Sequence, residues 1–228
     1  MVERALITGT SRGIGRATAL ELAGRGCELL LVGRASDKHE ATVDACRAIG
    51  ATVHSFDCEL SDAAAIDRSA RLILAERGPP TIVINNAGVL EAEAAVHELP
   101  VNDWDRVMAV NLRAPFLLCR ALLPAMLDAG RGRFIHVASV SATIGCPKRS
   151  AYGASKWGLL GFHKALHEEL AGTGLQSIAV LPGSVDTDML ALTAFEPDMS
   201  AEEVAALIAY YALEAPAAVA GANVEIYG

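Results

Sequence analysis

Residues 5–15 read ALITGTSRGIG, an apolar segment that runs directly into a glycine-rich turn. The segment ALIT has the nearly continuous apolar character of a parallel strand that is buried on both faces. Gly9, Gly13 and Gly15 follow it, and glycine permits a tight turn and a close approach of backbone atoms. The next residues have helical periodicity, and a helix start offers free N–H groups to a phosphate. This stretch therefore predicts the strand, turn and helix that begin a dinucleotide-binding sheet.

Six further apolar segments repeat the strand pattern along the chain. They are residues 28–32, 52–56, 81–85, 133–139, 176–181 and 223–227. Longer segments with helical periodicity separate them, and such alternation favours right-handed crossovers and a doubly wound sheet. No linker, repeat or low-complexity tract marks a second domain. We therefore expect a single α/β domain over residues 1–228, with a parallel sheet of about seven strands flanked by helices.

Composition and net charge limit the classes of molecule that this protein is expected to bind. The chain has 228 residues, is 52% hydrophobic and carries a formal net charge of -8, which argues against nucleic acid or an anionic membrane as its main partner. The apolar run at residues 204–213 is too short to span a bilayer, and the N-terminus enters a strand pattern without a signal region. Five cysteines form no CxxC pair. These features predict a cytoplasmic protein with reduced thiols and no metal site.

A second stretch, residues 139–156 (SVSATIGCPKRSAYGASK), carries the candidate chemistry. Tyr152 and Lys156 lie four residues apart on one face of a predicted helix, so their side chains are about one turn apart. A nearby ammonium favours the phenolate and lowers the tyrosine pKa from its usual value near ~10. Alternatively, Tyr152 is a surface residue covered by the Lys156 stem. Ser139 lies just upstream, where a strand is expected to end.

Six motifs in order resemble those of the short-chain dehydrogenase/reductase family, across essentially the whole chain. They are Thr8-Gly9-x-x-x-Gly13-x-Gly15, Asn85-Asn86-Ala87-Gly88, Asn111, Ser139, Tyr152-x-x-x-Lys156 and Pro182-Gly183-x-Val185-x-Thr187. The resemblance implies a Rossmann-type NAD(P)-binding domain that also contains the active site.

The resemblance assigns catalytic roles to Asn111, Ser139, Tyr152 and Lys156. Tyr152 would donate a proton to a carbonyl oxygen as hydride arrives, or accept one in the oxidation direction. Lys156 would lower the Tyr152 pKa and bind the nicotinamide ribose, and Ser139 would stabilise the substrate oxygen. Asn111 would hold a water that links Lys156 to solvent, although a structural polar residue satisfied by backbone is the alternative. Ser141 is a rival to Ser139, but Ser139 has the family's spacing from the tyrosine.

The resemblance also implies a set of cofactor-binding residues. They are Gly9, Ser11, Arg12, Gly13, Ile14, Gly15, Arg34, Asp57, Cys58, Asn86, Ala87, Gly88, Tyr152, Lys156, Pro182, Gly183, Val185 and Thr187. Asp57 would accept a hydrogen bond from the adenine amine, with the Cys58 backbone beside it. The alternative is that Asp57 is a carboxylate at the N-terminus of the next helix. The Asn85 and Asn86 amides are expected to hold the backbone together across the sheet.

Cofactor choice is predicted from the end of the second strand. NAD-preferring members of the family commonly carry an acidic residue there, whereas this chain has Gly33-Arg34. Arg34 and Arg12 would clamp a 2′-phosphate with charge-assisted hydrogen bonds, which favours NADP(H) over NAD(H). The alternative is that Arg34 is an ordinary solvated arginine.

Residues 189–199 are expected to form a short substrate lid. Met189, Leu190, Leu192 and Phe195 would line an apolar pocket or, slightly favoured, pack the lid on the body. The preceding Pro182-Gly183 loop resembles the one that contacts the nicotinamide carboxamide.

These expectations point to NADPH-dependent reduction of a ketone or 3-oxoacyl substrate to an alcohol. Acyl carrier protein is a possible partner through Arg131, Arg133, Lys148 and Arg149, but it is not favoured because residues 171–174 lack an arginine that such reductases often carry. The alternative function is a non-catalytic NADP-binding sensor or scaffold of the same fold. Extensive apolar faces on the helices around Asn111 and Tyr152 favour a homodimer or homotetramer.

Overall fold

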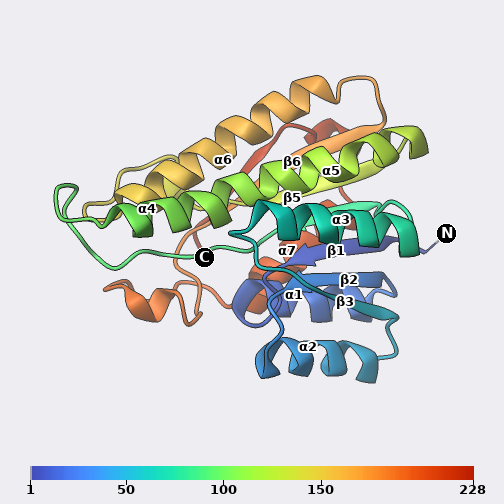
Figure 1. Cartoon of the computed structure of the whole chain (residues 1–228), viewed down its shortest axis with the longest axis horizontal. Coiled ribbons are helices and arrows are strands. Elements are labelled where there is room, and N and C mark those ends of the chain that lie inside the picture. The colour runs from blue at the N-terminus through green and yellow to red at the C-terminus, as the bar shows by residue number, and fades with distance from the viewer. Residues whose placement is uncertain (1) are drawn as a thin grey trace.

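The computed structural model describes residues 2–228, which form three layers with a seven-stranded sheet in the middle (Figure 1). The strand order is β3-β2-β1-β4-β5-β6-β7, and every neighbouring pair is parallel. The strands are β1 (Arg4–Thr8), β2 (Glu28–Gly33), β3 (Val53–Asp57), β4 (Ile82–Asn85), β5 (Gly132–Val137), β6 (Leu175–Pro182) and β7 (Asn223–Ile226). All seven predicted strands are present, and the predicted doubly wound sheet is confirmed.

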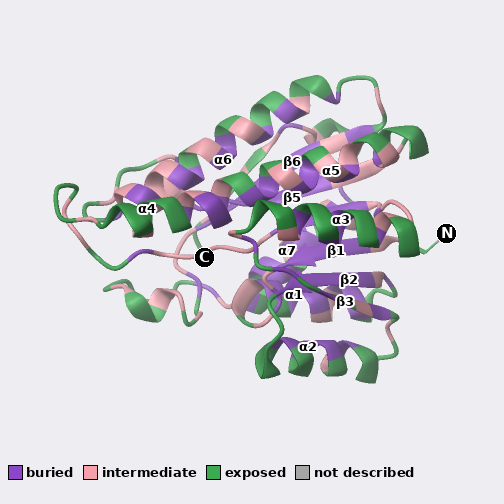
Figure 2. Ribbon diagram, in the orientation of Figure 1, coloured by how far each residue is buried: buried purple, intermediate pink, exposed green. Residues whose placement is uncertain are grey.

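Helices cover both faces of the sheet. One face packs against α1 (Gly13–Gly24), α2 (Asp37–Ala48) and α7 (Ala201–Leu213). The other packs against α3 (Ala63–Arg77), α5 (Ala114–Ala129) and α6 (Ser150–Glu169), with α4 (Val101–Met108) leading into α5. Short helical turns are η1 (Ala109–Arg113), η2 (Val140–Ala142), η3 (Leu190–Leu192) and η4 (Ala217–Val219). Figure 2 shows the buried strands between helices whose outward faces are exposed.

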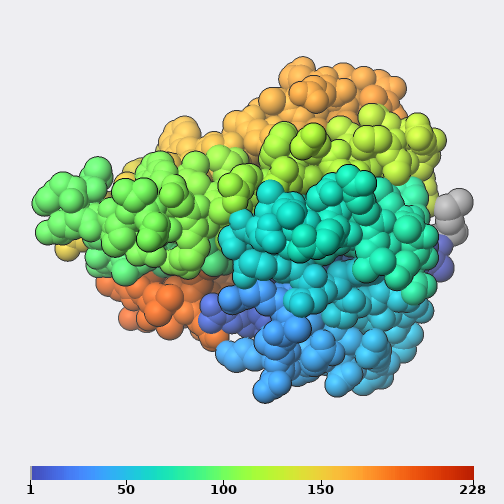
Figure 3. All heavy atoms as spheres, in the orientation of Figure 1, coloured from blue at the N-terminus to red at the C-terminus, as the bar shows by residue number. Residues whose placement is uncertain are grey.

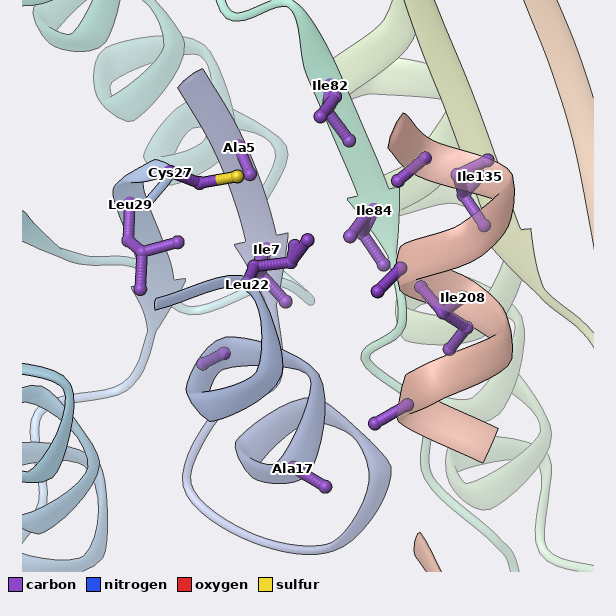
Figure 4. Close-up of a cluster of buried hydrophobic side chains, with 14 of the residues drawn as sticks. Ala5, Ile7, Ala17, Leu22, Cys27, Leu29, Ile82, Ile84, Ile135 and Ile208 are labelled. Atoms are coloured by element: carbon purple, nitrogen blue, oxygen red, sulfur yellow. The ribbon is translucent and has the colours of Figure 1, made fainter. Parts of the chain in front are cut away.

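Alternation along the strands divides the core into two halves. In β1, Ala5 and Ile7 face α1 and α7, whereas Leu6 faces α3 and α5, and all three are fully buried. Figure 4 shows Ile208 of α7 beside Ile84 and Ile135 of the central strands. Burial on both faces explains why the central strands β1, β2 and β4 are almost continuously apolar, whereas the edge strands β3 and β7 carry polar residues and are partly exposed.

The helical segment around Asn111, residues 101–129, is interrupted. The π-helical turn η1 separates α4 from α5, and the Ala114 N–H reaches back to the Ala109 carbonyl. Pro115 has no N–H to give to the Asn111 carbonyl, so the sequence itself disfavours a regular helix here. By length and composition Val101–Ala129 could cross a membrane, yet half of its most apolar window is buried inside the fold.

The carboxyl ends of the strands meet at one edge of the sheet, where long loops gather (Figure 1). The loop after β4 and the segment after β6 both extend from this edge. Figure 3 shows them, in green and orange, at the same end of the molecule. Ligands of open α/β sheets bind at such an edge, so the candidate site is sought there.

Candidate active site

The glycine turn, residues 9–15, packs so closely on neighbouring backbone that Gly9 and Gly15 could not carry a side chain. Gly9 has φ +72°, and a Cβ there would lie 2.8 Å from the Ala87 Cα. A Cβ on Gly15 would lie 2.2 Å from the Gly9 carbonyl oxygen. Helix α1 follows with Arg12 at its N-cap and no capping side-chain hydrogen bond, so no side chain caps its first amides. This arrangement fits a phosphate bound at the helix start.

The turn after β4 supports the glycine turn from behind. The Asn86 side chain donates from Nδ2 to the Thr8 and Gly9 carbonyls at 2.8 and 3.2 Å. Asn86 therefore bridges the backbones of β1 and β4 as expected. Asn85 does not: its side chain is buried and lies 3.3 Å from a ring nitrogen of His136, so that part of the prediction is wrong. Its position inside β4 directs it into the protein interior.

The basic groups at this edge each face a carboxylate. Arg12 Nη1 lies 2.8 Å from Asp188 Oδ2, and Lys38 Nζ lies 3.4 Å from the same oxygen. These two cations hold the Asp188 pKa below its usual range, Arg12 contributing most. Arg34 instead lies 3.9 Å from Glu59, with its side chain 79% exposed. Arg12 is thus paired with Lys38 around Asp188, rather than with Arg34 as predicted.

Asp57 and Cys58 lie where β3 ends beside β2. Asp57 Oδ1 accepts a hydrogen bond from the Ala35 N–H at 2.9 Å, and the Cys58 N–H donates to the Gly33 carbonyl at 2.9 Å. The Cys58 thiol is buried, and burial raises its pKa. Asp57 is at the predicted edge, while the Cys58 amide is committed to holding the two strand ends together.

Ser139, Tyr152 and Lys156 meet at the end of β5. Lys156 is 4% exposed, and its Nζ donates to the Val137 carbonyl at 2.9 Å. The same Nζ lies 5.5 Å from the centre of the Tyr152 ring. Ser139 is buried, and its side chain interacts with the Tyr152 hydroxyl. The Ser141 backbone N–H donates to Ser139 Oγ, and it is the Ser139 side chain that interacts with Tyr152.

The protonation of this cluster follows from its burial. Burial lowers the pKa of Lys156 to about 8, so the ammonium remains largely protonated near neutral pH. Burial raises the pKa of Tyr152, the Ser139 hydrogen bond opposes that rise, and the Glu91 charge adds to it. The sequence-based expectation of a lowered Tyr152 pKa is therefore not met, because desolvation of the phenolate outweighs the stabilising contacts.

Asn111 lies in the η1 turn beside this cluster. It is 1% exposed, and its side chain makes two hydrogen bonds to the Val89 backbone. Oδ1 accepts from the Val89 N–H at 2.8 Å, and Nδ2 donates to the Val89 carbonyl at 2.9 Å. Nδ2 also donates to Ser155 Oγ at 3.1 Å. The Asn111 side chain therefore has the structural role that the sequence analysis gave as the alternative, because its polar atoms bond to protein groups. Only its main-chain carbonyl remains as the candidate for holding a relay water.

The loop after β6 closes the other side of the site. The Gly183 N–H donates to the Ile226 carbonyl at 2.8 Å, and Val185 is buried and bridged to Met199. A Cβ placed on Gly13 would lie 3.1 Å from Thr187 Cγ2. The β6 loop therefore touches the glycine turn directly, as a shared cofactor site requires.

The expected lid is mostly exposed. Leu192 and Phe195 are 65% and 59% exposed, so these two side chains do not pack the segment on the body. Met199, at its end, is buried and anchors it. The favoured packing interpretation is wrong for Leu192 and Phe195, whose side chains reach solvent.

The structure adds two residues that the sequence analysis did not place in the site. Glu91 is 2% exposed, and its Oε1 accepts from the Ala151 and Tyr152 N–H groups at 3.0 and 3.1 Å. Arg149 is 5% exposed and donates to the carbonyls of Glu91 and Leu192. These partners lie 43 to 61 residues apart in sequence, so no local spacing announces them.

Across the described part of the chain, no group of three or more His, Cys, Asp or Glu side chains is arranged to hold a metal ion.

Comparisons with known proteins agree with this geometry. A family model described as short chain dehydrogenase matches residues 3–196. Short chain dehydrogenase pigC of Monascus ruber is 35% identical over 190 residues, which cover 81% of this chain and 63% of that protein. The 3-oxoacyl-acyl-carrier-protein reductase of Escherichia coli is 32% identical over 238 residues, covering 98% of this chain and 95% of that protein. A crystal structure of a metagenomic short-chain oxidoreductase in complex with NADP is 35% identical, with a TM-score of 0.86 over 99% of this chain and 96% of that chain.

Proposed function

This chain belongs to the short-chain dehydrogenase family of oxidoreductases, and we propose that it reduces a carbonyl group to an alcohol with NADPH. The observation that carries the proposal is the meeting of Ser139, Tyr152 and Lys156 at the sheet edge that also carries the glycine turn. A phosphate-binding turn and a protonated acid at one sheet edge are what hydride transfer to a carbonyl requires.

In the proposed reaction Tyr152 donates its proton to the carbonyl oxygen. The Tyr152 phenol is protonated at neutral pH, as a proton donor must be, and its pKa is raised chiefly by burial. Ser139 donates a hydrogen bond to the same oxygen and stabilises its developing charge. Lys156 would bind the nicotinamide ribose, and the Asn111 main-chain carbonyl would hold the water that returns a proton. The nicotinamide supplies the hydride when bound.

The preference for NADP(H) over NAD(H) rests on charge at the adenosine end. Arg12 and Lys38 converge on one carboxylate, which is the arrangement that a phosphate would also satisfy. Arg34 is exposed at the end of β2 and free to turn toward the same group. The NADP-bound relative supports this assignment by similarity.

The substrate is proposed to be a small or medium ketone or a 3-oxoacyl compound. The exposed Leu192 and Phe195 of the 189–199 lid offer an apolar wall for it. A carrier-protein substrate is not favoured. Arg133 bonds the Tyr211 and Ala215 carbonyls, at the end of β5 opposite Ser139, and Arg149 is buried, so neither is available for docking.

A homodimer or homotetramer in the cytoplasm completes the proposal. Phe116 on α5 and Trp157 on α6 are 43% and 54% exposed. The Phe116 ring packs edge to face against the Phe162 ring, with 6.0 Å between the two ring centres. These apolar groups favour a helix-to-helix subunit interface. Sedimentation at micromolar concentration tests it: dimers or tetramers are expected, and a monodisperse monomer would contradict it.

The enzyme proposal is tested by binding and turnover together. We expect NADPH to bind more tightly than NADH in fluorescence titrations, and NADPH oxidation with at least one of the ketones, diketones, quinones or 3-oxoacyl thioesters in a panel. Tight NADPH binding without turnover across the panel would favour the non-catalytic sensor or scaffold instead.

A further inference from the structure

The helix that carries Tyr152 begins without a cap of its own. Arg149 is at the N-cap of α6 and makes no capping side-chain hydrogen bond, and the first turn contains no acidic residue. Lys148, just before it, has φ +61°, the only positive φ of a non-glycine residue in the range 2–228. The chain therefore enters α6 through an unfavourable conformation, and its first amides need a partner from elsewhere.

Glu91 supplies that partner from the loop after β4. Its Oε1 accepts from the N–H of Ala151 and from the N–H of Tyr152 itself. The two helical residues follow Glu91 by 60 and 61 positions, so the contact ties two distant loops together. Arg149 holds the Glu91 backbone in place by donating to its carbonyl. The start of α6 is thus fixed at the residue proposed to donate the proton.

The Glu91 carboxylate also brings negative charge to the start of the helix that carries the phenol. Its second oxygen, Oε2, is buried and has no hydrogen-bond partner among residues 2–228. The charged groups around Tyr152 are Glu91 on the β4 loop, Lys156 on α6 and Arg149 at the helix start. A buried carboxylate at this position disfavours a second negative charge on the phenolate.

We propose that Glu91 is a positioning residue for Tyr152, capping the catalytic helix from a distant loop and placing a negative charge at the start of the helix that carries the phenol. This inference rests on the proposed role of Tyr152 as acid. Glu91 is a buried acid that does not belong to the proposed catalytic set of Asn111, Ser139, Tyr152 and Lys156. The inference gives it a positioning role in the same reaction. The charge and the cap are separable, because glutamine keeps an acceptor oxygen but loses the charge.

The test compares Glu91→Gln with Glu91→Asp and with Glu93→Gln. Glu93 is on the same loop, and its 53% exposed side chain pairs with Arg149 at 3.2 Å. It makes no hydrogen bond to the α6 amides, so its substitution is the control for losing a carboxylate near Arg149 without losing the helix cap. The readout is tyrosinate absorbance during a pH titration, with the Tyr152→Phe protein subtracted to isolate this phenol. It needs no substrate and no turnover.

Removing the negative charge lowers the Tyr152 pKa, so in Glu91→Gln the Tyr152 transition should move to lower pH by about half a unit to one unit. Glu91→Asp and Glu93→Gln should titrate like the wild type. With an active substrate, the loss of kcat at high pH should shift in the same direction. An unshifted Glu91→Gln, or an equal shift in Glu93→Gln, would overturn the inference. Absent turnover in the wild type would instead count against the proposed function, because the absorbance readout does not depend on it.

Discussion

The two walls of the candidate site, one on either side of the sheet edge, hold their polar groups in different ways. On the wall formed by α6, η1 and the β4 loop, Glu91, Asn111 and Lys156 are at most 4% exposed, and each makes a defined hydrogen bond. On the wall formed by the glycine turn and α2, Arg12 and Lys38 have side chains 53% and 68% exposed and share one carboxylate.

The two walls differ in how easily their polar groups can exchange one partner for another. An unpaired buried polar group costs about 1–3 kcal/mol, so the buried wall has one arrangement. An exposed ion pair is worth about 0–1 kcal/mol, so Asp188 is easily replaced by another anion. The buried wall is suited to hold reacting groups still, and the exposed wall is suited to exchange partners when a phosphate arrives.

The largest effect is expected on the buried wall, for Asn111→Leu. This change leaves the Val89 N–H and carbonyl and the Ser155 hydroxyl without their partner. We expect the free energy of unfolding to fall by about 2–4 kcal/mol in urea titrations. Asn102→Ala, at an exposed position on α4, is the control and should stay within about 0.5 kcal/mol of the wild type. A stable Asn111→Leu protein would show that the wall is not held by this side chain.

A second effect should appear as sensitivity to acid. Burial lowers the pKa of His136 to about 3 and of His163 to about 4, against about 6.5 in an unfolded chain. Between about pH 7 and pH 5 the unfolded state therefore takes up protons that the folded state does not, and stability falls. We expect a loss of about 1–2 kcal/mol per histidine, measured by urea unfolding at both pH values.

His163→Gln should remove its share of this pH dependence, whereas His97→Gln, at a side chain 83% exposed, should leave it unchanged. An identical pH slope in His163→Gln and the wild type would contradict the assignment of acid sensitivity to the buried histidines.

On the exposed wall, Arg12→Ala should weaken NADPH binding by about tenfold and NADH binding by less, because only the former has a 2′-phosphate. Fluorescence titration of both cofactors measures the ratio. Arg68→Ala removes an exposed arginine from α3 and should leave both affinities unchanged. Equal weakening of both cofactors by Arg12→Ala would mean that Arg12 does not select the phosphate.

The smallest effect should come from Asp188→Asn. The substitution removes the carboxylate that competes with a phosphate for Arg12 and Lys38. NADPH binding should tighten by about twofold to fivefold while NADH binding stays the same. Weaker NADPH binding in this variant would show that Asp188 supports the site rather than competes for it.

Much of the buried wall was predictable from sequence. The central strands are buried on both faces and nearly continuously apolar, so most of the sheet was recognisable, and parallel strands place Ser139 and Asn86 at one edge. The Tyr152 and Lys156 pair follows from helical spacing alone.

The remainder depends on tertiary contacts. The Glu91 cap on α6 joins residues 60 apart, and the sharing of Asp188 by Arg12 and Lys38 joins three segments. The direction of the Tyr152 pKa was mispredicted because sequence spacing reports a nearby lysine and does not report desolvation. Lys38 had a detectable signal, a basic residue just after the second strand, and was missed.

The most direct test of the account is Tyr152→Phe, assayed for NADPH binding and carbonyl reduction side by side. The substitution removes only the hydroxyl, so the thermal midpoint and the NADPH Kd should stay near wild type while kcat falls by about 10²–10⁴-fold. Turnover close to wild type, with cofactor binding retained, would contradict the assignment of Tyr152 as the acid on which the proposed reaction depends.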